Sequence, residues 1–158
     1  MNHSIDTTDR EILDCLRIDA RMSCSEISRR LGNMTARSVR NRLDRLLEKG
    51  FISINACAVA EQIGLPISAD IAMDVEPGMI EQVAKQLVAL EETNYVAMTT
   101  GDNDISVSIV AATLGDLQDI ISNKLHTIPG VRKTRTSMLT KILKVSCNWP
   151  FPKKFRQP

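Results

Sequence analysis

The sequence predicts an α+β fold in which short helices occupy the first third of the chain and strands alternate with helices in the rest. Up to about residue 50, apolar residues recur at helical spacing, with capping residues between the runs. From about residue 67 onward, segments of strict apolar–polar alternation are separated by helical segments. The 158 residues, 43% hydrophobic and 25% charged, have a globular composition, which excludes a disordered or fibrous chain.

The first fifty residues predict three helices, each introduced by a capping residue. Asp6 precedes the first helix, and Ser23-Cys24-Ser25-Glu26 is a capping box before the second. Gly32 favours the left-handed turn that ends the second helix. Thr35 caps the third helix, whose apolar stripe consists of Val39, Leu43, Leu46 and Leu47. Two helices joined by a tight turn containing glycine indicate a helix-turn-helix.

The face of the third helix opposite this stripe carries side chains of the types that bind DNA bases and phosphates. Arginine binds guanine and asparagine binds adenine through paired hydrogen bonds, while serine and arginine also hold phosphates. At about 100° per residue, the outward residues are Arg37, Ser38, Asn41 and Arg45, with Arg40 and Arg42 on the flanks. This face predicts binding to double-stranded DNA. The alternative is a solvated surface on which Asp44 and Glu48 pair with neighbouring arginines.

Charge is segregated along the chain, although the net charge is only +1. Residues 21–49 carry a net charge of +5, residues 61–130 carry −9, and residues 131–158 hold eight bases and no acid. Because a basic segment attracts a polyanion and an acidic segment repels it, the parts of the chain are expected to have different partners. An aromatic content of 3% disfavours a stacking platform for bases or for a large planar cofactor.

The remaining hundred residues predict the order βαββαβ, a ferredoxin-like unit. We expect strands at 67–75, 95–100, 104–110 and 131–145, and helices through 80–88 and 114–125. The whole chain then divides into a winged-helix-like helix-turn-helix domain at 1–51, a linker strand at 52–65, the ferredoxin-like domain at 66–146 and a tail at 147–158. In the tail, Trp149 and Phe151 either pack on a neighbouring subunit or belong to a frayed terminus.

Several kinds of site are not expected. The four cysteines form no CxxC pair, and the chain shows no metal-ligand cluster, nucleophile–base pair or glycine-rich phosphate loop. We therefore expect no metal, no cofactor and no catalytic residue. No apolar run approaches the roughly 18 residues of a membrane span, and the polar N-terminus lacks a secretory signal. These features favour a cytoplasmic protein without a membrane partner.

Segments in both halves of the chain match one family. They are Ile5–Leu13, Asp19–Ser23 with Glu26–Ser28, Arg42-Leu43 with Leu46, Lys49–Ile52, Thr99–Asp104, and Ile128–Val131 with Thr134 and Thr136. With these residues the chain resembles the Lrp/AsnC (feast/famine) family of prokaryotic transcriptional regulators over nearly all of residues 5–145. The resemblance implies a DNA-binding helix-turn-helix and a second domain that dimerises and binds a small effector, often an amino acid. Family dimers commonly assemble into rings such as octamers.

The resemblance also implies an effector site. The turn Gly101-Asp102-Asn103-Asp104 aligns with the family's effector-cleft loop, where main-chain N–H groups hold a carboxylate and Asp102 or Asp104 holds an ammonium group. Thr100 adds a hydroxyl, and His126 borders the same cleft. The alternatives are a plain hairpin turn and a histidine at the surface end of a helix.

Two other functions stay open at this point. Some relatives with this architecture are sirohaem decarboxylases, but such an enzyme needs His, Arg or Tyr groups in a pocket, and the chain offers only His3, His126 and Tyr95 as its His and Tyr residues. The other is an amino-acid sensor that does not bind DNA, which the outward arginine face of the third helix disfavours.

Overall fold

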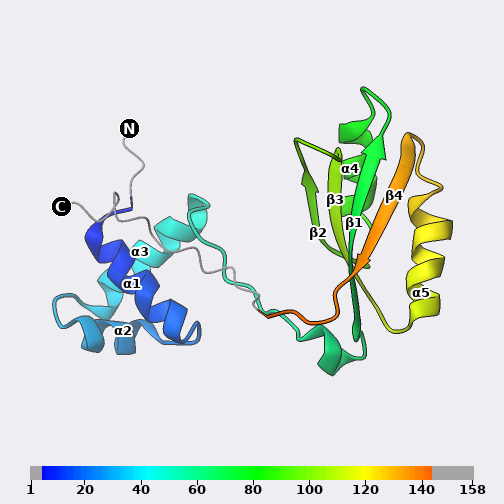
Figure 1. The fold of residues 1–158 in the computed structure, drawn as a ribbon. Helices are drawn as coiled ribbons and strands as arrows, with labels where there is room; N and C mark the ends of the chain where they lie inside the picture. Colours follow the sequence, from blue (N-terminus) through cyan, green and yellow to red (C-terminus); the bar gives the residue numbers. More distant parts are fainter. Residues whose placement is uncertain (1–4, 144–158) are drawn as a thin grey trace. The chain divides into compact units, whose positions relative to one another are not determined.

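A computed structural model describes residues 5–143 of the chain and divides them between two compact units, 5–56 and 57–143 (Figure 1). Each unit has its own cluster of buried apolar side chains. The boundary between the units falls inside the predicted linker at 52–65. The predicted tail at 147–158 lies outside the described residues.

The first unit consists of three helices, as predicted. They are α1 (Thr7–Ile18), α2 (Cys24–Leu31) and α3 (Ala36–Glu48), and their N-caps are Asp6, Ser23 and Thr35. Gly32 ends α2 with φ 72°, a left-handed conformation that glycine adopts without steric cost. Ile12, Ile27 and Val39, one from each helix, are fully buried and pack into one core. The predicted helix-turn-helix is thus held together by a small apolar centre.

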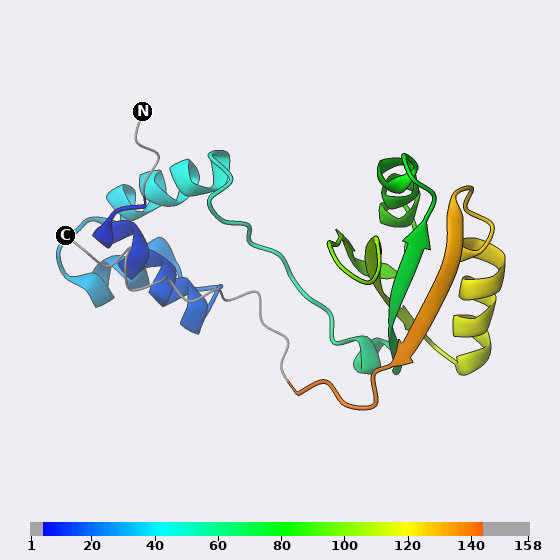
Figure 2. The same cartoon turned by 45° about the horizontal axis from the view of Figure 1, so that its top comes forward.

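The second unit is a four-stranded antiparallel sheet with both helices on one face (Figure 2). Its strands are β1 (Ile67–Val75), β2 (Thr93–Met98), β3 (Ile105–Ala111) and β4 (Val131–Met138), in the order β2-β3-β1-β4. Helix α4 (Ile80–Val88) joins β1 to β2, and α5 (Leu114–Asp119) follows β3. Alternate residues of β1 and β3 face these helices and are buried, which confirms the predicted ferredoxin-like order.

The elements differ from the predictions in three places. Strand β2 begins and ends two residues earlier than predicted. The second helix of this unit continues as a π-helix, η2 (Ile120–Leu125). Strand β4 ends at Met138, not at residue 145, because β1 begins at Ile67 and offers β4 at most two further partners. The Leu139 N–H still donates to the Ser68 carbonyl at 2.9 Å, beside the Ala69–Met138 pair.

The predicted linker strand is absent. Residues 52–59 have no regular secondary structure, and a single-turn helix, η1 (Ala60–Ile63), follows them. A strand needs a neighbouring strand to pair with its N–H and C=O groups. The described sheet has β2 and β4 at its edges, and residues 52–59 pair with neither. Among residues 5–143, no helix is long and apolar enough to cross a membrane.

Candidate functional site

The N-terminus of α3 is fixed by its cap and by the turn before it. The Thr35 Oγ1 accepts a hydrogen bond from the Ser38 N–H at 3.2 Å, and the Ser28 hydroxyl donates to the Met34 carbonyl at 2.6 Å. On the inner face, Val39 and Leu46 are fully buried, whereas Leu47 is 40% exposed. The predicted stripe was therefore wrong at Leu47, which lies at the margin of the packed surface.

Four of the six predicted DNA-binding residues lie exposed on α3. They are Arg37, Ser38, Arg40 and Asn41. Within the described part of the chain, neither Arg37 nor Arg40 forms an ion pair. Their guanidinium groups are thus free to bind an external anion. Asp44 and Glu48, predicted by the alternative interpretation to neutralise the arginines, form none of the ion pairs in the described residues either.

The other two arginines contact α1, which corrects the predicted outward position of Arg45. The Arg42 Nη1 donates to Asp6 Oδ2 at 2.6 Å and to Asp9 Oδ1 at 2.8 Å, and the Arg45 Nη2 donates to Asp9 Oδ2. Helical periodicity places Arg45 opposite the apolar stripe but cannot show that an acid of another helix reaches it. Asp9 was missed as a site residue, although it lies three residues before Ile12, on the buried side of α1.

The charges in this cluster stabilise one another. Burial acts to raise the pKa of Asp6, but hydrogen bonds from Arg42 and the Asp9 N–H, with the charges of both arginines, hold that pKa below its usual value. The bonds to Asp6 and Asp9 in turn raise the pKa of Arg42. Asp6 and Arg42 therefore stay ionised at neutral pH.

The predicted effector loop is tied to the sheet by its own side chains. The Asp104 Oδ2 accepts a hydrogen bond from the Val75 N–H at 2.8 Å, and the Asp104 N–H donates to the Met73 carbonyl at 2.9 Å. The Asn103 Nδ2 donates to Thr99 Oγ1 and to the Ile105 carbonyl. Asp104 thus has one carboxylate oxygen engaged with β1, whereas Thr100, Gly101 and Asp102 are exposed.

Arg135 of β4 also holds this loop and was not predicted from the sequence. Its guanidinium forms a bidentate pair with Asp74, at 2.9 and 3.0 Å, and donates to the Asp102 carbonyl at 2.9 Å. The hydrogen bonds from Arg135 lower the pKa of Asp74. Because these residues lie far apart in sequence, only the register of β1 and β4 could have revealed the contact.

His126 forms its side-chain hydrogen bond with strand β4. Its Nε2 is 2.8 Å from Thr134 Oγ1, and Thr134 points from β4 toward the helices. Arg135, the next residue, reaches the loop from the opposite face of the sheet. The structure therefore joins His126 to β4 and not to the loop.

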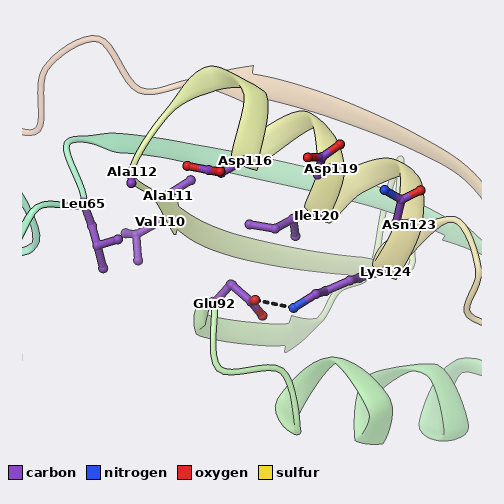
Figure 3. A pocket seen from close by; sticks show the side chains of 10 residues that line it. All are labelled: Leu65, Glu92, Val110, Ala111, Ala112, Asp116, Asp119, Ile120, Asn123 and Lys124. Carbon is purple, nitrogen blue, oxygen red and sulfur yellow. Dashed lines mark hydrogen bonds and ion pairs between the residues drawn. The ribbon is translucent and has the colours of Figure 1, made fainter.

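A cavity of about 450 Å³ lies elsewhere in the second unit, between the α5–η2 segment and the end of β3 (Figure 3). Its lining includes Val110, Asp116, Ile120 and Asn123, and the ion-paired side chains of Glu92 and Lys124 face each other beside it. Lys124 lowers the pKa of Glu92 through their hydrogen bond. None of the predicted effector residues lines this cavity. Within residues 5–143, no group of His, Cys, Asp or Glu is arranged to hold a metal ion.

Comparison with protein families decides what these two units are. The family of the Lrp/AsnC ligand binding domain matches residues 68–149, and the winged helix-turn-helix DNA-binding family matches residues 5–53. The chain belongs to the Lrp/AsnC family. The helix-turn-helix match spans α1 to α3, and the ligand-binding match spans all four strands, so this regulator carries a DNA-binding unit and an effector-binding unit.

Related proteins agree with this assignment over most of their length. An uncharacterized HTH-type transcriptional regulator of Pyrococcus abyssi is 38% identical over 152 residues, which cover 96% of this chain and 93% of that protein. The HTH-type transcriptional regulator LrpA of Pyrococcus horikoshii is 33% identical over 89% of this chain and 99% of its own. The solved structure of Escherichia coli AsnC, 22% identical, superposes with a TM-score of 0.85 over 94% of this chain and 100% of AsnC, which supports the same fold.

The contact between Arg135 and the loop gives a first prediction. In this regulator, Arg135→Gln removes the bidentate pair and the bond to the Asp102 carbonyl, so the loop is expected to open more often. Hydrogen exchange followed by mass spectrometry should show a few-fold faster exchange of the Thr99 and Asp104 amides, both hydrogen-bonded in the structure. Arg132→Gln, on the same strand, is the matched control and should leave the loop unchanged. Equal exchange in both variants would show that Arg135 does not hold the loop.

Proposed function

We propose that this regulator binds specific double-stranded DNA through the exposed face of α3 and responds to an amino acid bound at the loop of residues 99–104. The observation that carries the proposal is the asymmetry of α3. Its apolar side is buried, while Arg37, Ser38, Arg40 and Asn41 are exposed on the other side. The helix-turn-helix match supports α3 as the helix that enters the major groove.

The exposed residues divide into base readers and phosphate binders. Arg37 and Asn41 lie one helical turn apart on one ridge, which suits bidentate bonds to neighbouring bases. Ser38 lies in the first turn, where main-chain N–H groups and the helix dipole favour a phosphate. Arg40, on the flank, is placed for a second phosphate. Arg42 and Arg45, which pair with Asp6 and Asp9, are assigned to holding α3 against α1 and not to DNA.

Symmetry extends this proposal to the assembled protein. A homodimer, which further assembles to an octamer in the manner the family resemblance implies, presents two α3 helices to successive major grooves. Half-sites are then expected about 10 bp apart or at a multiple of that spacing. We propose a DNA-binding domain at residues 1–51 and a second domain at 66–146 that forms the dimer. The proposed location is the cytoplasm. The relatives named above are regulators, and we propose no catalytic activity.

The loop offers groups that suit an amino acid. The Asp102 main chain is held by Arg135, which leaves its exposed carboxylate for an ammonium group, and Thr100 and the Gly101 amide are available for a carboxylate. Asp104 is assigned to positioning, because one of its oxygens binds the Val75 N–H. A structural neighbour of this regulator, NMB0573 of Neisseria meningitidis, is described as a complex with L-Met, so amino acids are the first ligands to test.

The decisive experiment is a titration of the full chain onto its own upstream DNA, followed by fluorescence anisotropy. Arg37→Ala and Asn41→Ala are each expected to weaken specific binding by about 1–3 kcal/mol, or roughly 5- to 150-fold. Each lost side chain removes a bidentate base contact. A scrambled duplex and a salt series accompany every titration, and amino acids added singly then identify the effector.

Lys85→Ala is the matched control, because Lys85 is an exposed cation of the second unit. This variant should bind both duplexes like the parent chain. If Arg37→Ala weakens specific and scrambled DNA equally, Arg37 contacts phosphate and not a base. Equal weak binding of the parent chain to both duplexes would contradict the proposed function itself.

A further inference from the structure

The N-terminus of α1 holds a closed network of two acids and two arginines, named here the Asp9 network: Asp6, Asp9, Arg42 and Arg45. The carboxylate of Asp9 is fully buried and accepts hydrogen bonds from both guanidinium groups and from the Asp6 N–H, the last at 3.1 Å. Asp6 accepts from the Asp9 N–H at 2.7 Å and from Arg42. A buried carboxylate without such partners would strongly destabilise the fold, so the four groups act as a unit.

This network makes the only side-chain hydrogen bonds between α1 and α3 in the described residues. The two helices also share an apolar core that includes Ile12 and Val39, and apolar contacts have little directional preference. Charge-assisted bonds to guanidinium groups do fix direction. The bonds of Arg42 and Arg45 therefore add a directional constraint on the rotation of α3, beside the packing of its buried face.

Arg45 lies on the same helical ridge as Arg37 and Asn41, at successive intervals of four residues. Its Nε is buried, so the head of the side chain is turned toward α1. Arg45, at one end of the ridge, is held against α1. The other two residues, Arg37 and Asn41, are exposed. The same bonds occupy two cations that helical periodicity alone would assign to DNA.

We propose that Asp9 is a positioning residue for DNA recognition, which orients α3 and withholds Arg42 and Arg45 from the DNA. The inference rests on the proposed function of α3 as the DNA-reading helix. Asp9 itself touches no DNA in this scheme. Its removal should convert Arg45 into a mobile cation close to the phosphates and weaken the hold on Arg42, which keeps its bond to Asp6.

The test compares the salt dependence and the specificity of DNA binding. Asp9→Asn keeps the size of the side chain but removes its charge, which frees at least one guanidinium group. We expect the ratio of specific to scrambled binding to fall about tenfold. We also expect the slope of log K against log salt to steepen by about 0.9 for each phosphate gained. A purely structural loss would lower affinity without steepening this slope.

A second variant tests whether Arg42 and Arg45 contact DNA, without leaving an unpaired buried charge. In the triple variant D9N/R42Q/R45Q only the half-exposed Asp6 keeps a charge, and the salt slope should equal that of the parent chain. If both arginines contact DNA in the parent, the slope should instead become shallower by nearly two phosphates, which would overturn the proposal. A parent chain that does not prefer its own DNA would refute the proposed function and not this inference.

A third measurement uses only the parent chain. It therefore tests the proposal even if a variant fails to fold. Phenylglyoxal modification read by mass spectrometry reports the reactivity of each arginine. Arg37 and Arg40 should react in the free protein and be protected by specific DNA. Arg42 and Arg45 should react slowly in both states. Protection of Arg42 or Arg45 by DNA, starting from high reactivity in the free protein, would contradict the proposal.

Discussion

Replacing Ile71 with alanine is expected to lower the free energy of unfolding of the second unit by about 2–5 kcal/mol. Ile71 is fully buried in the central strand β1, between β3 and β4, and belongs to the core beneath α4 and α5. The substitution removes three carbons and leaves a cavity that the two flanking strands cannot close. Hydrogen exchange of the second unit, followed by mass spectrometry in increasing urea, measures the change.

Val88→Ala is the control for this substitution, because Val88 is 68% exposed at the end of α4. It should change the stability by less than about 0.5 kcal/mol. Amides of the first unit, residues 5–56, should exchange alike in both variants, since that unit has its own core. A loss below about 1 kcal/mol for Ile71→Ala would show that the core beneath the sheet is loosely packed.

Gly130→Ala is expected to destabilise the same unit by a similar amount, about 2–5 kcal/mol. Gly130 has φ 96°, and an added Cβ would lie 2.9 Å from the Met79 Cβ and 3.2 Å from its Cγ. The Met79 Cβ is fixed to the main chain just before α4 and cannot move aside alone. Two penalties therefore add, one from the backbone conformation and one from the overlap. The shift of the urea midpoint of the second unit measures their sum.

Two other glycines separate these penalties. Gly78→Ala places a side chain at φ 83° in open space, so it should cost only the conformational part, about 1–2 kcal/mol. Gly115→Ala lies in α5 with an ordinary contact of 3.6 Å to Thr113 Oγ1 and should be neutral or slightly stabilising. If Gly130→Ala and Gly78→Ala cost the same, the overlap with Met79 does not contribute.

The parts of the fold that local sequence determines were predicted well. The caps Asp6, Ser23 and Thr35 depend on hydrogen bonds within four residues, and each begins the helix that was predicted from it. The strands β1 and β3 show their alternation directly in the sequence. The order βαββαβ then leaves few topologies, since both helices must cover one face of the sheet.

The main errors concern contacts between distant residues. The end of β4 depends on where β1 begins, and the linker strand fails because no described strand lies beside it. In the candidate site, periodicity selected the correct exposed residues of α3 but could not identify Asp9 as the partner of Arg42 and Arg45. Periodicity likewise could not identify Arg135, which lies on β4 and donates a hydrogen bond to the loop. The assignment of individual residues to DNA and effector stays a prediction.

The Asp9 network also bears on how quickly the regulator finds its operator. A chromosome offers millions of unrelated sites. The affinity of a protein for these sites rises with each phosphate that the protein neutralises. By keeping two cations of α3 paired with its own acids, α1 is expected to lower this non-specific affinity without removing a base contact. The regulator then dissociates sooner from irrelevant sequence, and fewer copies per cell suffice to occupy its own operator.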